Sequence, residues 1–239
     1  TSGTATIDGG AGNDSIVGDI GDLVLRGGPG DDKLYAGSGA DVLWADAGTD
    51  TLSGGTGSDI FNVVTQAGRE ALTVDISDED GAADTIALSL DTGGVPVELP
   101  AGEITQGDAR ITYGTGIEKL TLQDQAALTQ IGSPLGGPLD LKSFQAFEAD
   151  TNGLLLSADL LATGDVRLRS PTSITFNGVD ITAEDLTVTG AVVQGQDFSW
   201  DATGDLTVDG VFASTGQFTL HVAAAAPFAP PLLRPDMAL

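Results

Sequence analysis

The fold is decided by residues 9–62, which read GGAGNDSIV GDIGDLVLR GGPGDDKLY AGSGADVLW ADAGTDTLS GGTGSDIFN when the chain is cut every nine residues. Position four is glycine in all six blocks, and position eight is always a large apolar residue. Position six is aspartate in five blocks, the exception being Leu23. The alternative is a flexible glycine-rich linker, but a linker has no reason to keep a large apolar side chain at every ninth position. A repeat solenoid is therefore predicted.

Each conserved position of the block has a physical role in such a coil. Glycine adopts positive φ, which permits a tight turn with its carbonyl groups pointing inward. The apolar residue at position eight lies in a short strand and points into the core. Two blocks make one coil, so residues 18 positions apart stack at about the 4.7–4.9 Å spacing of paired strands. The aspartates then stack in two rows, which are Asp14, Asp32 and Asp50 on one side and Asp41 and Asp59, with Leu23, on the other.

Stacked carboxylates repel one another unless a cation lies between them. Calcium fits, because it takes about six to eight oxygen ligands, including turn carbonyls. The complete pairs Asp14/Asp32, Asp32/Asp50 and Asp41/Asp59 are predicted to bind Ca²⁺, and the Leu23/Asp41 pair to bind weakly or not at all. The predicted metal site also contains the turn glycines Gly9, Gly10, Gly12, Gly27, Gly28, Gly30, Gly37, Gly39, Gly48, Gly54, Gly55 and Gly57.

These blocks resemble the RTX (repeats-in-toxin) nonapeptide GGxGxDxUx, in which U is a large apolar residue. The blocks that begin at Gly9, Gly27 and Gly54 match every fixed position. The resemblance implies a calcium-binding β-roll in a protein that leaves a Gram-negative cell by type I secretion, without a cleaved N-terminal signal, and folds when it meets calcium outside. Asp19, Leu23, Ala36 and Ala45 depart from the pattern, which puts the site of the second block in doubt but not the roll.

The composition agrees with a cation-binding protein. Asp and Glu number 35 against 9 Lys and Arg, for a formal net charge of −26. Such a charge argues against nucleic acid as a partner, because nucleic-acid proteins carry basic surfaces. The chain has no cysteine, which excludes disulfides and thiolate metal sites. No apolar run is long enough for a membrane span, and no N-terminal signal peptide is evident.

Residues 63–150 are less regular and are expected to form irregular β-coils and loops. Alternating apolar residues predict strands at 72–76, 85–90, 109–113 and 119–122. The acidic stretch Asp75–Asp84 precedes the sequence Asp84-Thr85-Ile86, which resembles the end of a repeat block. Two interpretations stay open for it: a degenerate calcium loop, and a solvated acidic turn, which is the favoured one.

Residues 151–222 carry a second period. DVRLRS begins at Asp165, DLTVTG at Asp185 and DLTVDG at Asp205, each 20 residues apart. This period favours one coil of a parallel β-helix, and the wording resembles filamentous-haemagglutinin-type β-helices, which implies a right-handed helix. An antiparallel sandwich is the alternative. The Ala/Pro-rich residues 223–239 are interpreted as a linker or as a strap in which Leu232 and Leu233 cover the open end of the helix. They do not look like the usual end of a type I secreted chain, so a fragment of a longer protein is suspected.

No catalytic motif is found, and the chain is predicted not to be an enzyme. The single histidine, His221, is expected to face solvent from a strand. No nucleophile elbow, zinc-binding motif or phosphate-binding loop is present. Trp44 and Trp200 are candidates for stacking on sugars, although packing on neighbours is favoured for both; the two tyrosines, Tyr35 and Tyr113, lie in different regions.

Three functions are consistent with this sequence. The favoured one is a structural or adhesive segment of a secreted, extracellular or cell-surface bacterial protein, with calcium as cofactor and with self-association as one candidate interaction. The second is the accessory calcium module of a secreted enzyme whose catalytic domain lies elsewhere. The third is a β-helix that binds or acts on extracellular acidic polysaccharide.

Overall fold

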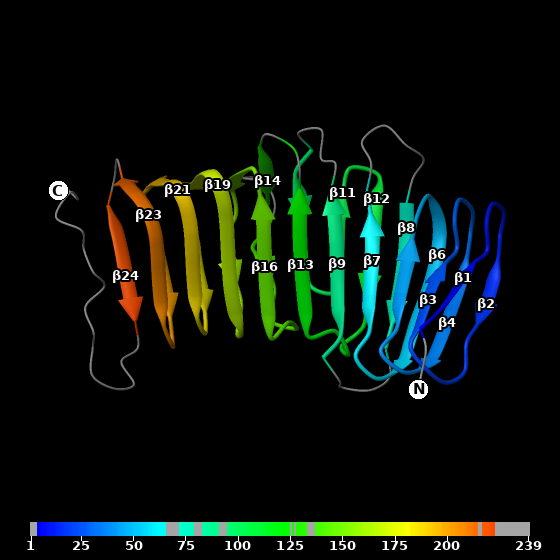
Figure 1. Cartoon of the computed structure of the whole chain (residues 1–239). Coiled ribbons are helices and arrows are strands. Elements are labelled where there is room, and N and C mark those ends of the chain that lie inside the picture. Colours follow the sequence, from blue (N-terminus) through cyan, green and yellow to red (C-terminus); the bar gives the residue numbers. More distant parts are fainter. Residues whose placement is uncertain are drawn as a thin grey trace.

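A computed structural model shows an all-β solenoid, in which the chain winds through stacked coils (Figure 1). The structure describes residues 4–65, 72–78, 83–90, 95–124, 126, 128–132, 137–214 and 217–222. Within these residues every helix or strand element is a strand. The described part also contains no helix that is long and apolar enough to cross a membrane. The predicted all-β solenoid, built largely of parallel strands, is confirmed.

The strands form three faces that run along the solenoid. The first face contains, in spatial order, β1 (Ala5–Asp8), β3 (Leu23–Arg26), β5 (Val42–Ala45), β7 (Ile60–Val64), β9 (Thr85–Leu90), β13 (Lys119–Asp124), β16 (Ala146–Thr151) and the N-terminal halves of β19 (Asp165–Asn177), β21 (Leu186–Gln196) and β23 (Leu206–Ser214). All of these pairings are parallel.

The second face contains β2 (Ser15–Val17), β4 (Lys33–Ser38), β6 (Gly48–Thr56), β8 (Leu72–Ser77), β12 (Ala109–Tyr113), β11 (Glu103–Gln106), β10 (Val97–Glu98), β14 (Thr129–Ile131), β17 (Gly153–Leu156) and the C-terminal halves of β19, β21 and β23. The third face contains β15 (Leu139–Asp140), β18 (Leu160–Leu161), β20 (Asp180–Ala183), β22 (Phe198–Ala202) and β24 (Phe218–Val222).

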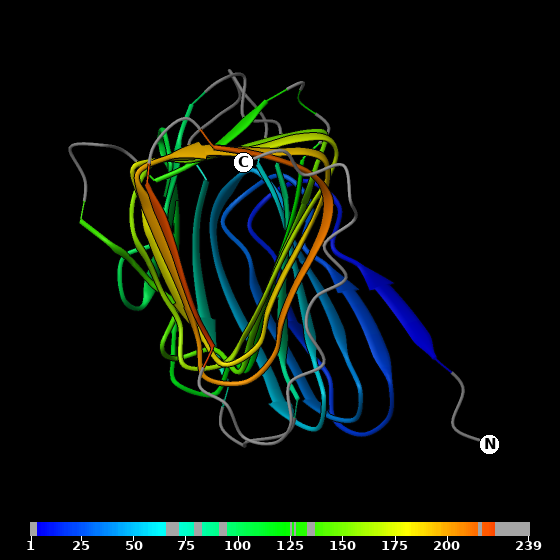
Figure 2. The ribbon, with the colours of Figure 1, turned by 90° about the vertical axis from the view of Figure 1, so that its left-hand side faces the viewer.

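The coil changes shape along the chain. In the repeat region the coil has two faces and a period of 18 residues, since Val24 pairs with Val42 and Val42 with Ile60. Beyond β15 a third face is present and the period is 20, as in the pairing of Leu186 with Leu206. Figure 2 shows the flattened first coils in blue and the three-sided last coils in yellow and orange. The 20-residue period therefore marks coils of a parallel helix, and the antiparallel sandwich is wrong.

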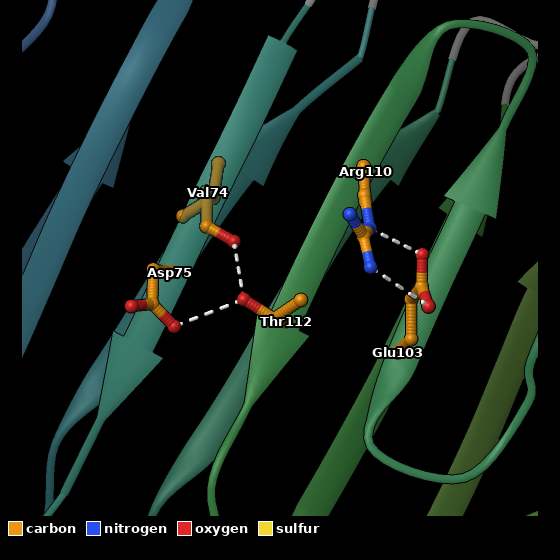
Figure 3. Close-up of polar contacts among 5 residues, drawn as sticks. All are labelled: Val74, Asp75, Glu103, Arg110 and Thr112. Atoms are coloured by element: carbon orange, nitrogen blue, oxygen red, sulfur yellow. Dashed lines mark hydrogen bonds and ion pairs between the residues drawn. The ribbon is translucent and has the colours of Figure 1, made fainter.

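One hairpin interrupts the parallel order. Strand β11 runs antiparallel to both β12 and β10, so the second face is mixed at this point rather than wholly parallel. The guanidinium of Arg110 holds the hairpin through the carboxylate of Glu103, with 2.6 Å between Nε and Oε1 (Figure 3). The hydroxyl of Thr112 donates to Asp75 at 2.9 Å and so joins β12 to the preceding coil. The four strands predicted in residues 63–150 are present as β8, β9, β12 and β13.

A single core joins the repeat coils to the later coils. On the first face the inward residue of each strand stacks on its counterpart in the next coil. This stack consists of Leu25, Leu43, Phe61, Ile86, Leu120, Phe147, Val166, Leu186 and Leu206. All but Leu206 are buried. Because the stack is unbroken, each coil presents an apolar platform to the next, as expected for a solenoid.

Candidate metal centre

The turns of the repeat coils stack so closely that glycine is required at two positions of each block. Gly28 and Gly30 have φ of 95° and 141°, which side chains rarely adopt. A Cβ on Gly28 would lie 1.8 Å from the carbonyl oxygen of Gly10, and one on Gly30 would lie 2.2 Å from that of Gly12. The other predicted glycines with positive φ are Gly10, Gly12, Gly37, Gly39, Gly48, Gly55 and Gly57. Stacked turns therefore bring backbone carbonyl oxygens close together.

The glycines at position one are needed for a different reason. Gly9, Gly27 and Gly54 do not have positive φ, so the sequence-based reason for glycine does not apply to them. A Cβ on Gly27 would lie 2.1 Å from Oδ2 of Asp32, and a Cβ on Gly9 would lie 2.6 Å from Oδ2 of Asp14. In these blocks the missing side chain leaves the room that the aspartate carboxylate occupies.

The aspartates form two ladders of hydrogen bonds, as their 18-residue spacing predicts. In the second-face ladder (Asp14, Asp32, Asp50), Oδ1 of Asp32 accepts from the backbone N–H of Asp14 at 2.8 Å, and Oδ1 of Asp50 accepts from that of Asp32 at 3.1 Å. In the first-face ladder (Leu23, Asp41, Asp59), the corresponding distances are 2.7 Å from Leu23 to Asp41 and 2.8 Å from Asp41 to Asp59. One carboxylate oxygen is thus committed to the neighbouring coil.

The second carboxylate oxygen marks the cation site. Oδ2 of Asp14, Asp32, Asp41 and Asp50 is buried and accepts no hydrogen bond. The last three of these side chains are almost fully inaccessible, with 2 % exposure or less. A buried carboxylate oxygen that accepts no hydrogen bond is costly unless a cation contacts it. Hard oxygen donors of this kind suit Ca²⁺, and the closely spaced turn carbonyls are further donors of the same type.

Burial also changes the proton affinity of the ladders. It raises the pKa of Asp50 to about 7, with the neighbouring carboxylates of Asp32 and Asp46 adding to the effect. Burial likewise raises the pKa of Asp32 and of Asp41. These directions hold for the protein without metal, and they mean that keeping the ladders ionised costs free energy unless positive charge is supplied.

The first-face ladder continues beyond the nonapeptide blocks. Oδ1 of Asp84 accepts from the N–H of Asp59 at 2.7 Å, and Oε2 of Glu118 accepts from the N–H of Asp84 at 2.9 Å. Carboxylate oxygens of Asp59, Asp78 and Asp84 lie within 4.8 Å of one another. Asp84 is fully buried, so the favoured sequence interpretation of a solvated acidic turn is wrong for this residue. The rest of the turn includes residues 79–82, which lie outside the described residues.

The second-face ladder ends inside the repeats, because Asp50 pairs with the apolar residue Val74 in the next coil. Asp84 and Glu118 escaped the sequence analysis because their coils are longer than 18 residues: Ile60 pairs with Thr85, and Thr85 with Lys119. A usable signal was present nevertheless. Each of these acids stands directly before a strand, as Asp59 does before β7.

The residues considered for other chemistry lie elsewhere. His221 faces outward from β24 with its side chain 72 % exposed, and its Nδ1 lies 2.9 Å from Oδ1 of Asp201. Trp200 is fully buried, so it does not present a stacking surface for sugars. Trp44 packs under the guanidinium of Arg26, 4.8 Å from its ring centroid. Both tryptophans therefore have the packing roles that were favoured.

Comparison with known families identifies the repeats. A family model for the RTX calcium-binding nonapeptide repeat matches residues 1–22 and 26–61 in four copies. The interruption at residues 23–25 falls on Leu23, where the aspartate is missing. No curated protein and no solved structure matches the chain. Repeats of this family bind calcium ions, so calcium is the metal of these coils.

Proposed function

We propose that this chain, whose first coils are RTX calcium-binding nonapeptide repeats, is a calcium-folded structural segment of a secreted bacterial surface or matrix protein. The observation that carries the proposal is the row of buried Oδ2 atoms in the two ladders. They indicate sites that are complete only when a cation is present.

The proposed ligands are the aspartate pairs Asp14/Asp32, Asp32/Asp50 and Asp41/Asp59, with backbone carbonyl oxygens of the stacked glycine turns. Calcium supplies the positive charge that lets these buried carboxylates stay ionised. The incomplete pair Leu23/Asp41 lacks one carboxylate and is a weak site or none. The family model is interrupted at this same position, which supports the assignment.

Calcium-dependent folding follows from the cost of burying the ladders. In the unfolded chain the aspartates are hydrated and far apart. Folding without metal brings them together and desolvates them, which raises their pKa. Since a cation binds the folded ladders and not the dispersed side chains, its binding free energy becomes folding free energy. Calcium sites of extracellular modules have dissociation constants of about 0.1–1 mM, which external calcium satisfies and cytosolic calcium does not.

A structural role is supported by the continuity of the solenoid. The first and second faces belong to one sheet that runs from the repeats into the later coils. Folding of the repeats would therefore extend a rigid rod rather than close a cleft around a substrate. The absence of sequence motifs for catalysis fits this role, and the acidic surface fits an environment rich in divalent cations.

The proposal is tested by far-UV circular dichroism during a calcium titration that begins in chelator. The wild-type chain is expected to gain β signal cooperatively. Asp32→Ala removes a carboxylate from two proposed sites and is expected to blunt the transition. Asp108→Ala is the matched control, since it removes the same charge from the exposed turn between β11 and β12. A spectrum that is fully β-rich in chelator and indifferent to calcium would refute calcium-coupled folding.

A further inference from the structure

Two acidic residues outside the nonapeptide repeats complete the first-face ladder. We infer that Asp84 and Glu118 are positioning residues of the calcium sites, which hold the backbone at the end of the ladder in the geometry that the aspartate pairs require. The inference rests on the proposed function and names a control on it that lies outside the repeats, since the family model ends at residue 61.

The ladder residues are joined by two hydrogen bonds in each step. Within the repeats, the N–H of Asp41 donates to Oδ1 of Asp59 at 2.8 Å, and the N–H of Ile60 returns to the carbonyl of Asp41 at 2.8 Å. Each residue is therefore held at both its N–H and its C=O by the following coil. Such a two-point clamp fixes the peptide planes on either side of the aspartate, and so the direction of its side chain.

Asp84 applies the same clamp to Asp59. Its Oδ1 accepts the N–H of Asp59 at 2.7 Å, and the N–H of Thr85 donates to the carbonyl of Asp59 at 2.9 Å. Asp59 belongs to the last aspartate pair of the repeats, so no nonapeptide coil follows to hold it. A residue from a longer coil takes that place with the geometry unchanged.

Glu118 repeats the clamp one coil later. Its Oε2 accepts the N–H of Asp84 at 2.9 Å, and the N–H of Lys119 donates to the carbonyl of Asp84 at 2.9 Å. In the following coil Gln145 and Ala146 donate to the carbonyl of Glu118, and Gln145 stands where the acid stood. The run of acids at this position thus ends at Glu118, which anchors the ladder to the later coils.

The second-face ladder supplies an internal comparison. It ends at Asp50, which is paired with Val74 and not with an acid. The pairs Asp14/Asp32 and Asp32/Asp50 are therefore expected to be insensitive to Glu118, whereas the Asp41/Asp59 pair depends on it. This difference separates a positioning role from a general loss of stability, which would affect both ladders.

The experiment compares calcium binding by calorimetry and backbone amide exchange by NMR in the full chain, using wild type, Glu118→Ala and Glu118→Gln. Loss of one charged acceptor in the alanine variant is expected to raise the calcium needed for the affected site about three- to tenfold. Exchange at the amides of Asp84 and Asp59 should accelerate, while the amide of Asp32 stays protected. Glutamine keeps an amide oxygen as acceptor and is expected to stay within about twofold of wild type.

Glu184→Ala is the matched control, because it removes an exposed glutamate from a later coil. If the alanine variant does not fold, Glu118→Asp carries the test: it keeps the charge but shortens the reach, and faster exchange at the Asp84 amide is expected. Calcium binding and exchange that match wild type in the alanine and aspartate variants would overturn the inference, as would a glutamine variant as impaired as alanine. A wild-type chain that takes up no calcium would instead refute the proposed function.

Discussion

Truncation of the core at Phe61 tests the coupling between folding and calcium quantitatively. Phe61 is fully buried and stacks between Leu43 and Ile86. Removing a buried phenylalanine side chain costs about 3–5 kcal/mol. If three ions bind only to the folded repeats, each tenfold rise in calcium stabilises them by about 1.4 kcal/mol per ion, or about 4.2 kcal/mol in total. A loss of about 4 kcal/mol is then offset by roughly a ninefold rise in calcium.

The assay is the midpoint of the calcium titration followed by circular dichroism. Phe61→Ala is expected to reach the wild-type spectrum at saturating calcium, but with its midpoint shifted upward by roughly ninefold. Ile20→Ala is the control, because Ile20 is 81 % exposed and its truncation should change the midpoint little. If Phe61→Ala lowers thermal stability and leaves the calcium midpoint unchanged, folding and calcium binding are not linked.

Two further predictions concern the ladders themselves. Because burial raises the pKa of Asp50 to about 7, the metal-free fold binds protons more tightly than the unfolded chain, so its stability is greatest in acid and is lost as pH rises from about 4 through about 7. Urea unfolding in chelator should show greater stability at pH 5 than at pH 8, and the reverse order would contradict this. Gly27→Ala places a Cβ 2.1 Å from Oδ2 of Asp32 and should raise the calcium midpoint, whereas Gly114→Ala meets nothing within 4 Å and should not; equal midpoints would refute the cradle.

The repeat coils were predictable because the period of nine is kept without a slip. Counting from Gly9 alone places Asp14 on Asp32 and Leu25 on Leu43, and both registers are observed. The physical basis is local: each turn repeats the same glycine conformations, so the register of one coil fixes the next. The 20-residue coils were predictable for the same reason.

The ladder extension and the hairpin were not predictable from a fixed period. Asp84 and Glu118 follow coils of other lengths, and only three-dimensional stacking brings them into line. The antiparallel strand β11 has a local signal in Gly107, which has φ of 59° in the two-residue turn between Gln106 and Ala109. That signal competes with the expectation of parallel coils, and it was outweighed by the surrounding repeats.

The metal requirement of the first coils follows from their thin cross-section. A two-faced coil offers little interior for apolar side chains, and small cores often need a metal to fold. The later coils have a third face, and their interior holds Phe176, Phe198 and Trp200, whose ring centroids lie 4.9–5.6 Å apart. Along the first face the residue before each strand changes from Asp59 to Asp84, Glu118, Gln145 and Gly164 as the coil widens. Negative charge is therefore kept where the core is thin, and it disappears where aromatic packing stabilises the stack.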